Sequence, residues 1–153
     1  MYSRNQASKL TQEFWTVFGA YMKPVPSADG GRVNWQNYRT GVRHLYFRMQ
    51  ADRSMASISI EIQHPDPLLG GLYFDQLRAL RPLFENELGE SWVWLSALSN
   101  KTSGQEYSVR KELEGVNVLN REHWPRIISF LKPRMIALDG FWSQAKYGFE
   151  GLR

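Results

Sequence analysis

The sequence contains no cysteine, which excludes catalytic thiols, cysteine-bound zinc and iron–sulfur clusters. The absence of cysteine also fits a reducing compartment, where disulfides are rare. No run approaches the roughly 18 consecutive apolar residues of a membrane-spanning helix, and the start MYSRNQASKLTQEFW lacks the apolar core of a signal peptide. We therefore expect a soluble, cytoplasmic protein without a membrane partner.

The signatures of nucleotide and cofactor chemistry are also missing. The chain has no Gly-x-Ser-x-Gly, Walker A or Gly-x-Gly-x-x-Gly motif. Its three histidines, His44, His64 and His123, do not have the spacing of a metal site. We therefore expect no cofactor and no resident metal.

Hydrophobic and aromatic residues are plentiful. Among 153 residues, 42% are hydrophobic, with six Trp, seven Tyr and eight Phe, which is enough for one domain over residues 1–153 with its own core. The net charge of +4 is unevenly distributed: residues 1–53 carry eight Lys/Arg and three Asp/Glu, whereas residues 54–120 carry five and nine. This pattern indicates either a surface for a charged partner or charge pairing within the fold.

Three segments have the periodicity of helices packed on one face. Residues 8–23 form the first, with Ser8 as a possible N-cap, and residues 72–90 form the second, in which Pro82 should kink or split the helix and Gly89 should end it. The third begins near Asn120, contains Pro133 and continues to about residue 150. Its predicted buried residues are Ile127, Leu131, Met135, Leu138, Trp142, Ala145 and Phe149.

The clearest strand is the stretch SMASISIEIQH at residues 54–64. Its apolar residues Ala56, Ile58, Ile60 and Ile62 alternate with polar residues, as in a strand with one buried face. The preceding residues 33–52 predict one or two strands with Gly41 as a turn or bulge. A hairpin tip at Asp52 and Arg53 would place His44 opposite Glu61, although a slip of two residues would preserve the same faces.

Residues 91–98 predict a short strand, residues 100–105 a turn, and residues 106–119 a further strand or hairpin. The expected fold is therefore α+β, in the order α-β-β-β-α-β-β-α. An antiparallel sheet of about five strands would be covered on its apolar face by the N-terminal, middle and long C-terminal helices.

The polar face of the predicted hairpin offers weak catalytic candidates: His44, Glu61 and Gln63. One interpretation is a divergent metal-dependent, nuclease-like hydrolase, because the element order is similar to that of PD-(D/E)xK nucleases. However, Gln63 stands where those enzymes have lysine, and Asp52 lies at the far end of the hairpin from Glu61. We favour the simpler interpretation, a solvated sheet face without catalysis.

Arginines interleave with aromatic residues in the N-terminal half. Arg39, Arg43, Tyr46 and Arg48 are the candidate nucleic-acid contacts, since basic side chains bind phosphates and rings stack on bases. The moderate charge favours the alternative that the rings pack in the core and the arginines solvate an edge strand.

The leading hypothesis is a non-catalytic binding or accessory module connected with nucleic acid. A protein-interaction module or homodimer, using aromatic surface on the C-terminal helix, is the other possibility.

Several segments together resemble an uncharacterised prokaryotic domain-of-unknown-function family. They are FWTVFGAYM, VNWQNYRTGVRHLYFRMQ, ASISIEI, ELGESWVW and REHWPRIISFL with LDGFW, and they run from Phe14 to Trp142. In larger relatives this domain often follows a restriction-endonuclease-like domain, and in others, as expected here, it stands alone. The resemblance implies a connection with DNA processing or defence against foreign DNA, and it carries over no active-site residues.

Overall fold

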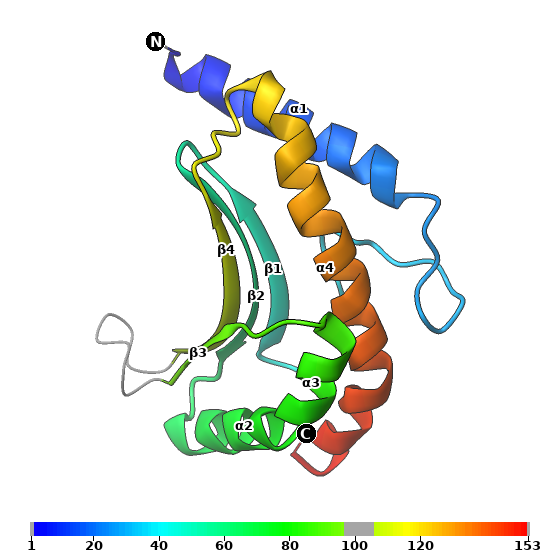
Figure 1. The fold of residues 1–153 in the computed structure, drawn as a ribbon. Coiled ribbons are helices and arrows are strands. Elements are labelled where there is room, and N and C mark those ends of the chain that lie inside the picture. The colour runs from blue at the N-terminus through cyan, green and yellow to red at the C-terminus, as the bar shows by residue number, and fades with distance from the viewer. Residues whose placement is uncertain (1, 97–105, 153) are drawn as a thin grey trace.

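The computed structural model of the protein describes residues 2–96 and 106–152, and they form an α+β fold (Figure 1). In the described part of the chain, four antiparallel strands form one sheet in the order β1-β2-β4-β3. The elements are α1 (Arg4–Met22), β1 (Leu45–Ala51), β2 (Met55–Gln63), α2 (Pro67–Ala79), α3 (Arg81–Leu88), β3 (Val93–Leu95), β4 (Glu106–Glu114), η1 (Arg121–His123), α4 (Trp124–Ala145) and η2 (Lys146–Leu152).

The core confirms the two strongest sequence patterns. Ala56, Ile58, Ile60 and Ile62 of β2 are all buried, and so are all seven residues of the predicted stripe from Ile127 to Phe149. Figure 1 shows α4 lying across one face of the sheet. The apolar face of β2 and the apolar stripe of α4 thus belong to one hydrophobic layer. This layer stabilises the fold by removing apolar surface from water.

The aromatic residues of α4 lie in that core and not on the surface. Trp124, Phe130, Phe141 and Trp142 are each at most 7% exposed. The sheet and the neighbouring helices thus use the rings of α4 for packing, whereas Tyr147 of η2, which belongs to the predicted C-terminal helix, is 60% exposed. None of the helices in the described residues has the length and apolarity required to cross a membrane.

The predicted strand or strands in residues 33–52 are reduced to β1, so the described sheet has four strands instead of five. Residues 33–44 form an irregular connection. Its Thr40 hydroxyl donates to the Leu45 carbonyl at 2.9 Å and accepts from the Val42 N–H at 3.1 Å, so these backbone groups bond locally instead of to a strand. Gly41 has φ +79°, a turn conformation that glycine adopts without strain.

The β1–β2 register differs from the predicted one by two residues. Tyr46 lies opposite Glu61, and the Gln63 N–H donates to the His44 carbonyl at 2.8 Å, so the predicted pairing of His44 with Glu61 is wrong. The cause lies in the turn, where the Asp52 carboxylate accepts from the Ser54 and Met55 N–H groups, each at 2.9 Å. This wider turn moves every pair by two positions but leaves each side chain on its predicted face.

The helix boundaries contain two further corrections. The middle helix begins at Pro67 and not at residue 72, because the Asp66 carboxylate accepts from the Leu68 and Leu69 N–H groups and caps α2. α1 is capped by Ser3 and not by Ser8: the Ser3 hydroxyl and the Gln6 side chain form a reciprocal capping box. The middle helix splits into α2 and α3, with Pro82 in the first turn of α3, and Gly89 ends α3 at φ +68°, as the sequence predicts. The predicted turn at residues 100–105 lies outside the described residues.

Candidate functional site

The sheet face opposite α4 is not covered by a helix of the described residues (Figure 1). Alternation places Tyr46 and Arg48 of β1, Ser59 and Glu61 of β2, and Arg110 of β4 on this face. We call it the open sheet face. It contains four of the side chains that the sequence singled out: Tyr46, Arg48, Glu61 and Gln63.

The charges of the open sheet face are paired with one another. The Glu61 carboxylate lies 3.3 Å from Arg48 Nε, and it accepts from Ser59 Oγ at 2.8 Å and from Gln63 Nε2 at 3.0 Å. Arg110 Nε lies 2.9 Å from Glu112 Oε2. Both oxygens of Glu61 are therefore engaged, and the two arginines each have a carboxylate beside them.

The catalytic candidates do not come together as an acid–base pair. The His44 ring packs against His64, with 4.4 Å between ring centroids. Partial burial, the neighbouring His64 and the charge of Arg43 lower the pKa of His44. Asp52 lies beside Met55 at the hairpin turn, and Glu61 is six residues further along the strand, a distance of about 20 Å. Among residues 2–96 and 106–152, no group of three His, Asp or Glu side chains is arranged to hold a metal ion.

Unpaired positive charge is concentrated in residues 23–44, which connect α1 to β1 and which we call the basic loop. Its cations are Lys23, Arg32, Arg39 and Arg43, all exposed. Within the described residues none of them forms an ion pair. Elsewhere in the described residues, seven cations form ion pairs and six do not. The paired ones are Arg48, Arg78, Arg81, Arg110, Arg121, Arg134 and Lys146, and the others are Arg4, Lys9, Arg53, Lys111, Arg126 and Lys132.

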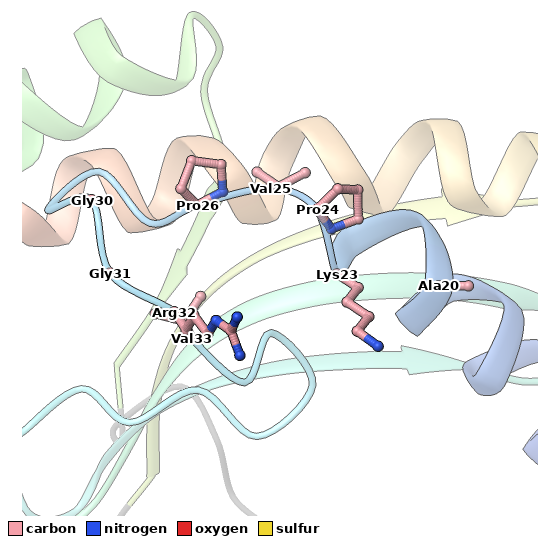
Figure 2. A pocket seen from close by; sticks show the side chains of 9 residues that line it. All are labelled: Ala20, Lys23, Pro24, Val25, Pro26, Gly30, Gly31, Arg32 and Val33. Atoms are coloured by element: carbon pink, nitrogen blue, oxygen red, sulfur yellow. The ribbon is translucent and has the colours of Figure 1, made fainter.

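Three adjoining hollows run along the basic loop. Lys23 and Arg32 line the first, of about 630 Å³; Figure 2 shows their side chains on the two arms of the loop. The second, of about 310 Å³, shares Arg32 with the first and also includes Arg39. Arg39 continues into the third, of about 530 Å³, which includes Arg43 and ends at Tyr46. Shared lining residues thus make one continuous basic surface.

Contacts from α4 hold the basic loop in place although it has no regular secondary structure. Buried Asp139 accepts from the Ala28 N–H and from the Tyr38 hydroxyl, each at 2.6 Å. Trp142 Nε1 donates to the Thr40 carbonyl at 2.7 Å. Burial, followed by the hydrogen bond to Asp139, raises the pKa of Tyr38 far above its usual range, so the hydroxyl stays protonated and donates.

The acid of the basic loop does not neutralise its cations. Asp29 is the one Asp or Glu in residues 23–44, and it lies 3.0 Å from Lys146 Nζ of η2. The pair ties the loop to the C-terminal end of the fold and leaves Lys23, Arg32, Arg39 and Arg43 available to a ligand.

The sequence singled out Arg39, Arg43, Tyr46 and Arg48, and the structure separates them. Arg39 and Arg43 lie in the basic loop, whereas Arg48 lies on the open sheet face beside Glu61. Tyr46 borders both surfaces. Sequence reasoning did not find Asp139, although an Asp beside Leu138 in the predicted buried stripe was a signal for a buried carboxylate with donors around it.

Comparison with known proteins identifies the family but no individual relative. Residues 10–146 match the family described as Domain of unknown function (DUF4268), which is most of the chain. Comparison with curated proteins and with solved structures found no match. The matched region runs from α1 through α4 and includes the whole basic loop. The chain therefore belongs to the DUF4268 family.

Proposed function

We propose that this protein is a non-catalytic accessory module that binds nucleic acid through the basic loop. The observation that supports the proposal is the contrast in pairing: the four cations of the loop have no carboxylate partner within the described residues, whereas the arginines of the open sheet face do. An arginine without an internal partner can bind a phosphate without first breaking an ion pair.

The anchoring of the loop favours binding for a second reason. Because Asp139 and Trp142 hold its backbone, the loop loses little conformational freedom when a ligand is bound. Cations along a backbone that is held in place suit an array of phosphates. The basic surface is irregular and shallow, as expected for a site that binds an extended polyanion and not an enclosed small molecule.

Arg39 and Arg43 are the main contact residues of the proposal, and Tyr46 and Arg48 extend the surface. The Arg48 guanidinium lies 4.6 Å from the centre of the Tyr46 ring and close to Glu61, which offsets its charge. We therefore assign Arg48 a smaller contribution. The resemblance to domains that follow restriction-endonuclease-like domains supports DNA as the ligand and a role in restriction or defence.

The test is the affinity for a fluorescent DNA duplex of about 20 base pairs, measured by anisotropy at low salt. Replacing both Arg39 and Arg43 by alanine removes two phosphate contacts, which weakens binding about 10-fold to 30-fold at about 0.15 M salt.

The matched control replaces Arg78 and Arg81, two ion-paired arginines of α2 and α3, by alanine. This variant loses the same charge and should bind within about threefold of the wild type, because these arginines lie outside the basic loop. Circular dichroism melting verifies that both variants fold. The proposal is wrong if the wild-type protein binds neither the duplex nor a single strand of equal length, or if the two double variants weaken binding equally.

A protein-interaction role is the second candidate, and one observation favours it. β3 lies at the edge of the sheet, and its Val93 and Leu95 side chains are 60% and 41% exposed. An edge strand with exposed apolar side chains can pair with a strand of another chain. Light scattering over a range of concentrations tests self-association: a second copy would raise the mass with concentration, and a Val93→Lys variant would abolish the rise.

A further inference from the structure

The aromatic residues of the basic loop face the core although they alternate with its arginines in sequence. Trp35 is 5% exposed, and its Nε1 donates to the Val25 carbonyl at 3.1 Å. The Tyr38 ring stacks on Phe47, with 5.0 Å between ring centroids, while its hydroxyl binds Asp139. The Trp35 ring is thus buried, and one face of the partly buried Tyr38 ring is occupied by Phe47.

The rings at the end of the loop are engaged as well. His44 packs against His64. Tyr46 is 37% exposed, but the Arg48 guanidinium already covers one face of its ring. The basic surface therefore offers charge along its length but little aromatic surface.

Glycine leaves the backbone bare at two places on this surface. A Cβ at Gly31, in the first hollow, or at Gly41, in the third, would have no other atom within 4 Å apart from the adjacent chain. A ligand can therefore approach the main chain closely between the cations, as phosphate oxygens do in other anion sites.

From these observations, and resting on the proposed function, we infer that the basic loop binds the sugar–phosphate backbone of duplex DNA without reading its bases. Phosphate contacts position a protein on a duplex but carry no sequence information directly. Proteins that bind single strands combine a basic groove with aromatic rings on which bases stack. The basic loop has the first of these features and uses its own rings for packing.

Charge density also favours the duplex. Double-stranded DNA carries one negative charge per about 1.7 Å of axis, and each neutralised phosphate contributes more to salt-dependent affinity than in a single strand. For four contacts, this difference alone makes a single strand bind about fivefold more weakly at about 0.15 M salt.

Two exposed tyrosines provide the alternative to this inference. Tyr46 ends the third hollow, and Tyr21, 53% exposed, lies at the C-terminal end of α1 with Lys132 Nζ 5.8 Å from its ring centre. If bases stack on them, alanine substitution of one ring weakens single-strand binding about fivefold or more.

The experiment compares three probes of equal length by anisotropy: a DNA duplex, a duplex of shuffled sequence, and a single strand of thymidines. We expect the two duplexes to bind equally within about twofold and the single strand to bind about fivefold more weakly. The Tyr21→Ala variant should bind the duplex within about twofold of the wild type, because backbone contacts do not require its ring. Tyr21→Ala and Tyr46→Ala are both measured with the single strand as well.

The results separate this inference from the proposed function. A single strand that binds as tightly as the duplex, with affinity lost in either tyrosine variant, overturns the inference while nucleic-acid binding stands. If one of the two duplexes binds tenfold or more tightly than the other, a difference of about 1.4 kcal/mol, the inference is also overturned. If none of the probes binds at about 50 mM salt, the proposed function fails and the inference fails with it.

Discussion

The basic loop and the open sheet face both carry arginines, but they hold them differently. On the regular strands, each of Arg48 and Arg110 has a glutamate within 3.3 Å. In the irregular loop, polar contacts hold the backbone, and the cations themselves have no ion pair among the described residues. The comparison teaches that the number of arginines in a region does not locate an anion-binding surface. What locates it is whether each arginine already forms an ion pair with a carboxylate.

The largest expected effect concerns the anchor of the basic loop. Replacing buried Asp139 by alanine leaves the Ala28 N–H and the Tyr38 hydroxyl without their acceptor in a partly buried site. We expect the free energy of unfolding to fall by about 2–4 kcal/mol, as measured by urea denaturation. On the open sheet face, Glu61→Ala should cost less, about 1 kcal/mol, because the Arg48 side chain is 42% exposed and water can replace its partner, so that the main loss is the acceptor of the Ser59 hydroxyl. Equal costs would remove the claimed difference between the two regions.

The same anchor predicts a dependence of stability on pH. The pKa of Tyr38 is raised in the fold, mainly by burial, so the folded protein keeps a proton that the unfolded chain releases above about pH 10. Stability is therefore fully present below that pH and falls above it, by up to about 1.4 kcal/mol per pH unit. Urea denaturation of the wild-type protein and Tyr38→Phe from neutral pH to above pH 10 should show the steeper fall in the wild type. Parallel curves would contradict the buried hydrogen bond.

A negative charge placed in the first hollow tests the basic loop without removing an arginine. Gly31→Glu adds a carboxylate where a Cβ meets no other atom within 4 Å, so the fold should tolerate it. We expect duplex binding to weaken about fivefold at about 0.15 M salt, equivalent to one lost phosphate contact. Gly151→Glu is the matched control, because its Cβ is equally unobstructed and it lies outside the loop. The same loss in both variants would indicate only an effect of net charge.

The smallest expected effect is a gain on the open sheet face. Glu61→Gln removes the charge that offsets Arg48 but keeps an acceptor for Ser59. We expect duplex affinity to rise about twofold to threefold, measured by anisotropy. The hydrolase hypothesis remains a prediction, and it predicts a loss instead of a gain for the same variant. The wild type would cleave DNA in the presence of Mg²⁺ or Mn²⁺, and Glu61→Gln would abolish the cleavage.

The sequence predicted the core better than the site. The stripe from Ile127 to Phe149 and the alternation in β2 were confirmed because burial on one face leaves a period in the sequence. The register was not readable, since a slip of two residues keeps every side chain on its face and the Asp52 carboxylate in the turn decides between the alternatives.

The basic loop was harder to predict for a different reason. Residues 33–44 resemble a strand in composition, but Thr40 bonds locally and Gly41 turns the chain. The contact that holds the loop joins Tyr38 to Asp139, 101 residues away along the chain. A pattern of nearby residues does not contain such a pair, so the sequence indicated the arginines of the site but not what positions them.

The most direct measurement is the salt dependence of duplex binding. If the four cations of the basic loop each neutralise one phosphate, a plot of log affinity against log salt concentration has a slope of about −3.6 for the wild-type protein and about −1.8 after Arg39→Ala with Arg43→Ala. An unchanged slope in the double variant would show that these side chains do not contact phosphate, and it would contradict the account.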